Sequence, residues 1–190
     1  MEERKMKKFT ALLLAVLLCL PLLPMAQADT QEEEPVLAGY TRKDAMTYIG
    51  DMKWEGFSTT IQEVNAVLWL PNFMTRMELP EEATQAGVLK AYGSEYLIVQ
   101  ICLADHGDVT LEDYLEAIPE EGGLNARIEQ VNEIDCLIYD REMENAPLCR
   151  VVAAKLSDGE FLEILYLAGD ESMDSMIEAS FATLRFKEGG

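Results

Sequence analysis

The sequence predicts an α+β domain built on an antiparallel β-sheet that helices cover on both faces. Three consecutive strands are expected over residues 134–167, joined by a polar turn at 141–147 and a tight turn at Asp158-Gly159. Glycine favours the second turn because it reaches positive φ at no steric cost. The last strand carries Leu162, Ile164 and Tyr166 on one face and Phe161, Leu165 and Leu167 on the other. A sheet with one face in water would alternate apolar and polar residues, so we expect cover on both faces.

Two expected helices carry apolar stripes that can cover the sheet. Thr110 is placed to cap the first, and Asp113 three residues later completes a capping-box pattern. Asp170 is placed to cap the second, near the end of the chain. The stripes recur at helical spacing. They consist of Leu111, Tyr114, Leu115 and Ile118 in the first helix, and Met173, Met176, Ile177, Ser180, Phe181 and Leu184 in the second.

The remaining segments complete a mixed order of helices and strands. Glycine, proline and asparagine residues separate the apolar stretches and set the expected ends of the elements. We expect a helix over 41–52, a hairpin over 57–70, a short helix over 72–79, a loop or helical turn over 80–86, a second hairpin over 88–104, and a strand over 126–131 that pairs with 134–140.

The first 28 residues have the three parts of a secretory signal peptide. Four basic residues between positions 4 and 8 precede an apolar core at 11–23, and residues 26–28 read Ala-Gln-Ala, a cleavage pattern. The apolar core is shorter than the roughly 20 residues of a membrane-spanning helix. We therefore expect a bacterial protein exported to the cell envelope or the extracellular space, with no membrane insertion after cleavage. Either Met1 or Met6 can be the start.

After the signal peptide, an acidic leader at 29–40 is expected to be disordered, and 41–190 is expected to form a single α+β domain. The chain has 35 Asp and Glu against 15 Lys and Arg, a formal net charge of −20. This charge disfavours nucleic acid and anionic membranes as partners, because both are polyanions. The expected partner is a protein or a small ligand at the envelope, although negative charge can also serve solubility alone.

Three cysteines follow the signal peptide: Cys102, Cys136 and Cys149. Each lies inside an apolar strand, so three buried free thiols are expected. A bridge between Cys136 and Cys149 on neighbouring strands is the alternative, and it needs Cα atoms within about 7 Å. A cysteine metal site is disfavoured, because the sequence has no Cys-x-x-Cys and only one histidine.

The best candidate for chemistry is the loop at 105–108, between an expected strand and the start of an expected helix. Asp105, His106 and Asp108 offer two carboxylates and an imidazole, which can bind a divalent cation. The same loop can equally serve only to turn the chain into the helix capped by Thr110. No cofactor is expected beyond this possible divalent cation.

Two further groups of residues each allow a binding and a structural interpretation. Trp54 and Trp69 can form a ligand platform or pack in the core. Acidic residues on two expected loops would attract a basic partner if the loops share one end of the sheet, and would otherwise be solvated turns. This acidic group comprises Glu120, Glu121, Asp140, Glu142 and Glu144. The sequence contains neither a Gly-x-Ser-x-Gly nucleophile elbow nor a Gly-rich phosphate loop.

Four segments between residues 57 and 186 carry a resemblance to a known family. They are a hairpin running into a Leu-Pro segment (VLWLPNFMTRMEL), a Tyr-containing helix (TLEDYLEAI), a turn and strand that ends in Tyr (NEIDCLIYDR), and a closing helix (IEASFATLRF). Their order resembles the PsbP-like, Mog-type α-β-α sandwich family, as found in small exported proteins of Gram-positive gut bacteria. Named members of that fold, extrinsic photosystem subunits and a Ran-GTPase partner, are non-catalytic binding proteins. The resemblance implies a binding module, and no functional residue carries over.

These observations predict an exported, non-catalytic binding module. Two alternatives remain, a carboxylate-based or metal-assisted extracellular hydrolase and a divalent-cation-binding protein. A cleft that holds carboxylates of raised pKa would favour the hydrolase. One exposed apolar patch would favour the binding module.

Overall fold

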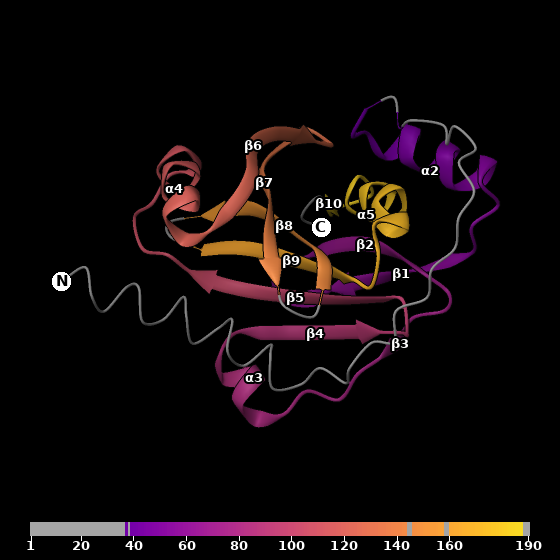
Figure 1. The fold of residues 1–190 in the computed structure, drawn as a ribbon, viewed down its shortest axis with the longest axis horizontal. Coiled ribbons are helices and arrows are strands. Elements are labelled where there is room, and N and C mark those ends of the chain that lie inside the picture. Colours follow the sequence, from indigo (N-terminus) through magenta and orange to yellow (C-terminus); the bar gives the residue numbers. More distant parts are fainter. Residues whose placement is uncertain (1–36, 38, 144–145, 158–159, 188–190) are drawn as a thin grey trace.

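The computed structural model describes residues 37, 39–143, 146–157 and 160–187, which form two antiparallel sheets and four α-helices (Figure 1). The large sheet has the strand order β3-β4-β5-β9-β8-β7-β6, and the small one has the order β1-β2-β10. The strands are β1 (Gly56–Ile61), β2 (Ala66–Pro71), β3 (Thr75–Arg76), β4 (Val88–Gly93), β5 (Leu97–Asp105), β6 (Gly123–Val131), β7 (Ile134–Met143), β8 (Ala146–Ser157), β9 (Glu160–Ala168) and β10 (Arg185–Phe186). The α-helices are α2 (Arg42–Asp51), α3 (Glu81–Gln85), α4 (Leu111–Ala117) and α5 (Asp174–Phe181), and the 3₁₀ turns are η1 (Gln62–Val64), η2 (Ile118–Glu121) and η3 (Glu171–Met173).

The three consecutive strands expected at the centre are β7, β8 and β9, and their antiparallel pairing is confirmed. Val152 at the middle of β8 pairs with Ile138 on one side and Ile164 on the other. The first turn is shorter than expected, because β7 runs to Met143 and β8 begins at Ala146. Backbone hydrogen bonding with the neighbouring strand therefore extends into the polar segment. The second turn, at 158–159, lies outside the described residues.

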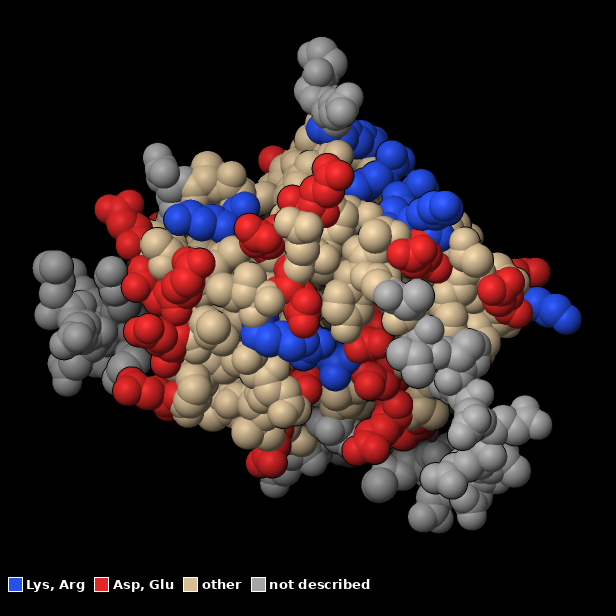
Figure 2. All heavy atoms as spheres, turned by 90° about the horizontal axis from the view of Figure 1, so that it is seen from above, with Lys and Arg blue, Asp and Glu red and all other residues tan. Residues whose placement is uncertain are grey.

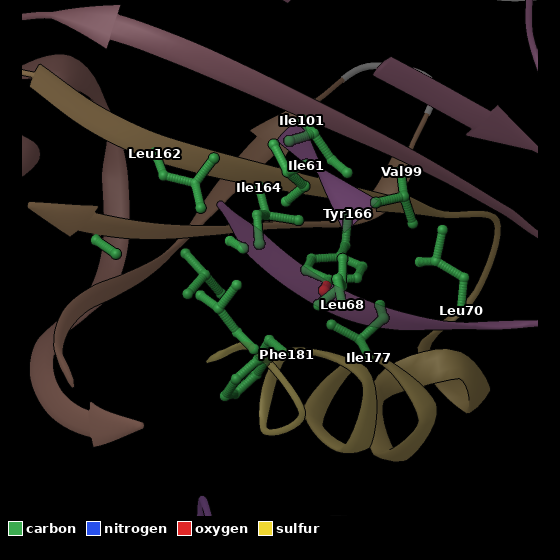
Figure 3. Packing of buried hydrophobic residues seen from close by; sticks show 14 of the residues in the cluster. Ile61, Leu68, Leu70, Val99, Ile101, Leu162, Ile164, Tyr166, Ile177 and Phe181 are labelled. Carbon is green, nitrogen blue, oxygen red and sulfur yellow. The ribbon is translucent and has the colours of Figure 1, made fainter. Parts of the chain in front are cut away.

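One face of the large sheet packs against the small sheet and α5. Figure 3 shows Ile177 and Phe181 of α5 pointing towards Tyr166 of β9, with Leu68 of β2 between them and the large sheet. Burial of each such side chain contributes about 1.5–3 kcal/mol to stability. The antiparallel α+β class is thus confirmed, but the cover on this face is a second sheet together with a helix. Helices alone were expected there.

The other face carries α4, which packs on β7 and β9. Leu111 and Tyr114 lie in one apolar cluster with Leu137 and Phe161. The predicted capping box is present, because the Thr110 hydroxyl accepts from the Asp113 amide at 3.0 Å while the Asp113 carboxylate accepts from the Thr110 amide at 3.0 Å. These bonds hold the start of α4 in place.

The chain leaves η2 through a close turn at two glycines. Gly122 has φ of 80°, a conformation that favours glycine. A Cβ at Gly123 would lie 2.2 Å from Cγ2 of Ile118, so any side chain there would force the buried Ile118 to move. This turn lets β6 begin at Gly123, three residues before the strand expected at 126–131.

Most of the other expected elements are present, and one is wrong. The helix capped by Thr41 and both hairpins are confirmed, and the segment 80–86 contains the short helix α3. The helix expected over 72–79 does not form. Instead Thr75 and Arg76 pair with Gly93 and Tyr92 of β4. Pairing with β4 satisfies the backbone hydrogen bonds of this short segment better than one or two helical turns between prolines would.

The three cysteines are free and buried, as expected. Cys136 lies on the face that meets α5, whereas Cys149 lies on the opposite face, and they pair with Ala154 and Arg141 respectively. The alternative bridge is therefore ruled out by geometry. Burial raises the pKa of Cys136 to about 12 and that of Cys149 to about 11, so both thiols stay protonated at neutral pH.

Candidate functional site

A buried carboxylate, Glu163, lies at the middle of β9 on the face that carries α4. It is 3% exposed and pairs in register with Cys102 of β5 and Ala153 of β8. A carboxylate in such surroundings loses its hydration and needs hydrogen-bond donors from the protein. Glu163 is therefore the strongest candidate for a functional carboxylate in the described part of the chain.

Two side chains from outside the sheet supply hydrogen bonds to Glu163. The Tyr114 hydroxyl of α4 donates to Oε1 at 2.8 Å, and Nε2 of His106 lies 2.8 Å from the same oxygen. The hydroxyls of Tyr114 and Tyr139 are 3.2 Å apart, which adds β7 to the group. We call Glu163, His106, Tyr114 and Tyr139 the glutamate cluster.

Aromatic packing closes the glutamate cluster. The His106 ring lies 4.7 Å from the Tyr114 ring and 5.1 Å from the Phe161 ring, measured between centroids. Burial, and next the charge of Glu163, raises the pKa of Tyr114 well above its usual value. The same two causes raise the pKa of the Cys102 thiol. The Tyr114 hydroxyl and the Cys102 thiol are therefore protonated at neutral pH, and neither is an activated nucleophile. The hydrogen bonds of the cluster connect the β5–α4 loop and α4 to β9.

The predicted metal ligands do not converge. His106 faces Glu163, the Oδ1 atom of Asp105 accepts from the Gly107 amide at 2.9 Å, and Asp108 is exposed. Within the ranges that the structure describes, no three His, Cys, Asp or Glu side chains are grouped so that they could hold a metal ion. The hydrogen bond within 105–107 supports the turn interpretation of this loop. The divalent-cation site stays a prediction.

A second buried polar group lies on the opposite face, around Arg150 of β8. Nε of Arg150 donates to Oδ1 of Asp140 at 2.9 Å, and Nη1 bonds to Asp174 and lies 3.7 Å from Glu178. Burial lowers the pKa of Arg150, but the bond to Asp140 and the three negative charges outweigh it, and the pKa is raised. We call Arg150, Asp140, Asp174 and Glu178 the arginine cluster. It ties α5 to β7 and β8.

The predicted acidic group is only partly assembled. Gly123 pairs with Arg141, so the loop before β6 and the end of β7 share one end of the sheet. Asp140, however, is held by Arg150 and accepts from Asn125 at 3.1 Å, so it is not available to a partner. The side chain of Glu121 and the whole of Glu144 lie outside the described residues. Figure 2 shows acidic side chains gathered on the side of the molecule where α4 lies.

The two tryptophans pack in the core between α2, α5 and β2. Trp69 is buried, and Trp54 lies partly buried against the same cluster as Met176 and Ala179. Trp54 also meets Tyr48 edge to face, with ring centroids 5.5 Å apart. The packing interpretation is therefore confirmed.

Three exposed aromatic rings lie at one end of the molecule, where the beginning of β1, the β2–β3 connection and the β4–β5 turn come together. Phe57 is 36% exposed, Phe73 38% and Tyr96 45%. Phe73 and Tyr96 meet edge to face at 6.1 Å, and Phe57 packs on the buried Tyr92 at 5.8 Å. We call Phe57, Phe73 and Tyr96 the aromatic surface.

Backbone pairing brings these rings together from distant parts of the chain. Gly56 pairs with Pro71, and Thr75 pairs with Gly93, so the neighbours of Phe57, Phe73 and Tyr96 are held at one end of both sheets. None of these three residues was a candidate from the sequence, because an aromatic residue in an expected strand, helix or turn carries no sign of whether it is exposed. No local pattern distinguishes an apolar residue at the end of a sheet from one at its centre.

No helix within the described residues is long and apolar enough to cross a membrane.

Comparisons with known proteins concern the fold. The chain is similar to the solution structure of cyanobacterial PsbP (CyanoP) from Synechocystis sp., with a TM-score of 0.50 and 11% identity over 70% of this chain and 92% of that chain. It is also similar to LpqN, described as involved in cell envelope biogenesis of Mycobacterium tuberculosis, with a TM-score of 0.39 and 15% identity over 75% of this chain and 93% of that chain. No protein-family model matches the chain, and no curated protein matches it. The first likeness shows a PsbP-like fold and speaks for the fold alone, and the second is too loose to add to it.

Proposed function

We propose that this chain is an exported, non-catalytic binding module of the bacterial cell envelope or the extracellular space, built as a PsbP-like sandwich with helices over both faces of the large sheet. The observation that carries the proposal is the aromatic surface. Three aromatic side chains that are each more than one third exposed come from segments that meet at one end of a small domain, and two of them are in ring contact. Exposed apolar side chains that gather in one region of a surface are a mark of interaction sites.

The aromatic surface has the properties of a binding centre. Phenylalanine and tyrosine carry large apolar areas, and aromatic residues are enriched where partners bury surface. Ring-on-ring contacts hold Phe73 against Tyr96 and Phe57 against Tyr92. Rings that are already held in place lose little conformational freedom when a partner covers them, which favours binding.

The buried polar groups support a non-catalytic role. Glu163, the most deeply buried carboxylate in the described chain, uses Oε1 to accept from Tyr114 and to contact His106. Arg150 is committed to three acidic side chains on the other face. Both clusters hold elements of the fold together, whereas the aromatic surface keeps more than one third of each ring exposed to a partner.

Site-specific crosslinking tests the proposal. A photoreactive phenylalanine analogue at position 73 is introduced in the source cells, and a matched chain carries it at Leu124, which is 46% exposed at the far end of the large sheet. We expect defined crosslinked species from position 73 and none of the same species from position 124. Further substitution of Phe57 and Tyr96 by serine should abolish the species from position 73.

Two outcomes would overturn the proposal. Identical crosslinked species from positions 73 and 124 would mean that the chain makes only non-specific contacts. The absence of any defined species from position 73, with the chain correctly exported and folded, would mean that the aromatic surface has no partner.

A further inference from the structure

We infer that the aromatic surface binds a cationic protein segment, one that presents Arg or Lys side chains to the exposed rings. This inference rests on the proposed function and names the chemistry of the partner. Its evidence is the combination of exposed aromatic rings with two nearby glutamates, one next to Tyr96 in the chain and one hydrogen-bonded to the residue before Phe73.

A glutamate lies close to each of the two paired rings, either along the chain or through a bond to a neighbouring residue. Glu95 directly precedes Tyr96, and its carboxylate, through hydrogen bonding first and then through its charge, raises the pKa of Tyr96. On the other side, Asn72 precedes Phe73 and donates from Nδ2 to Oε2 of Glu55 at 2.9 Å. The backbone amide of Asn72 also donates to the carbonyl oxygen of Glu55, at 3.0 Å. Glu55 is therefore held against the residue that precedes Phe73, and Glu95 is the chain neighbour of Tyr96.

The arrangement of the rings suits a cation. Phe73 and Tyr96 are perpendicular, with 83° between their planes, so the face of one ring is not covered by the other. A guanidinium or ammonium group is attracted to such a face, and a carboxylate nearby adds a charge-assisted hydrogen bond. Arginine is the best match, because its flat guanidinium can stack on a ring and bond to a carboxylate at the same time.

The charge of the rest of the chain points the same way. With 35 acidic and 15 basic side chains, the chain repels anions and attracts cations at long range. One nearby basic residue opposes this, because Arg76 is exposed on β3, three residues beyond Phe73. A cationic partner should therefore bind more tightly when Arg76 is neutralised.

Three peptides of one design test the inference by fluorescence anisotropy. The first alternates Gly, Arg and Leu, the second has citrulline in place of every Arg as a neutral isostere, and the third has Glu. Measurements are made at about 0.15 M salt, where the Debye length is about 8 Å and distant charges contribute little. We expect the arginine peptide to bind at least about tenfold more tightly than the citrulline peptide, and the glutamate peptide not to bind.

Variants of equal net charge separate the aromatic surface from general attraction to an acidic protein. The double substitution Phe73→Ala and Tyr96→Ala should weaken binding of the arginine peptide about tenfold or more, whereas Leu124→Ala should leave its affinity unchanged. Phe73→Leu keeps apolar area but removes the ring, so it should weaken the arginine peptide about two- to fivefold and leave the citrulline peptide unaffected. Two further variants change the net charge by one and test the local charges: Glu95→Gln should weaken, and Arg76→Gln should strengthen, binding of the arginine peptide.

Equal affinity for the arginine and citrulline peptides, or an arginine affinity that the Phe73 and Tyr96 substitutions do not change, would overturn the inference. Circular dichroism of each variant shows that a loss of binding is not a loss of folding. Binding to phosphatidylglycerol vesicles that depends on Phe73 would also overturn it and would favour a membrane surface. If crosslinking from position 73 still traps a partner while the peptides fail, the binding module stands and only the cationic partner is wrong.

Discussion

Two buried polar clusters lie on opposite faces of the same sheet, and they are built in opposite ways. In the glutamate cluster, one acid receives a tyrosine hydroxyl and a histidine ring. In the arginine cluster, one cation is surrounded by Asp140, Asp174 and Glu178. The first has a single formal negative charge at its centre, and the second has three negative charges around one positive charge.

This difference determines how much stability each cluster should lose when its central residue is replaced. Removal of the acid from the glutamate cluster leaves the hydrogen bond between the Tyr114 and Tyr139 hydroxyls in place. Removal of the cation from the arginine cluster leaves three carboxylates facing the same space, which repel one another. The central residue should therefore matter more on the α5 face than on the α4 face, although Glu163 and Arg150 are both buried.

The largest effect is expected from Arg150→Leu. We expect it to lower the free energy of unfolding by about 2–4 kcal/mol, less than for a fully buried pair because Asp174 and Glu178 are partly exposed. Urea denaturation followed by circular dichroism measures this. The matched control is Arg127→Leu, whose surface contact with Glu129 at 3.4 Å should be worth less than about 1 kcal/mol. Equal losses for the two variants would contradict the special position of Arg150.

A smaller effect is expected from Glu163→Leu. It leaves the Tyr114 hydroxyl and the His106 ring without their shared acceptor, so we expect a loss of about 1–3 kcal/mol. Glu163→Gln keeps an acceptor oxygen and should cost less than about 1 kcal/mol. Hydrogen exchange should quicken in 106–118 for Glu163→Leu and in 174–181 for Arg150→Leu. A Glu163→Leu loss larger than that of Arg150→Leu would reverse the comparison.

The sequence was sufficient for the parts of the molecule that depend on local patterns. The strands β7, β8 and β9 were predictable because their residues are apolar on both faces, and the start of α4 was predictable because Thr110 and Asp113 are three residues apart. The helix predicted over 72–79 was wrong, because the structure of this segment is decided by pairing of Thr75 with Gly93 and of Arg76 with Tyr92, which are distant in the sequence.

The candidate sites were harder to predict because they are made by distant residues. The loop at 105–108 could be recognised as polar from the sequence. The partner of His106 could not be predicted, because Glu163 is 57 positions away. Glu163 did leave one signal, as a single acid inside the apolar run FLEILYL. The aromatic surface left none, because exposure of Phe73 follows from where the strands end.

The cap of α4 tests how far the glutamate cluster depends on its helix. Thr110→Ala removes the hydroxyl that accepts from the Asp113 amide and should lower stability by about 1 kcal/mol. Because α4 carries Tyr114, exchange should quicken around the glutamate cluster and not around Arg150. Thr41→Ala, which removes the cap of α2, is the matched control and should leave exchange in α4 unchanged. A uniform increase over both faces would show that the two clusters are not independent.

The smallest effect is expected from Asp113→Asn, and it should depend on pH. The hydrogen bond from the Thr110 amide, and next the one from its hydroxyl, lowers the pKa of Asp113. The carboxylate therefore contributes stability above the ordinary aspartate pKa of about 3.9, and this contribution is lost as the pH falls through the lower value of the folded state. Thermal melts should show Asp113→Asn less stable than the parent chain at neutral pH, with the difference vanishing in strong acid. Glu112→Gln removes the same charge one position earlier without touching the cap, so a pH-dependent loss of equal size there would assign the effect to the helix dipole alone.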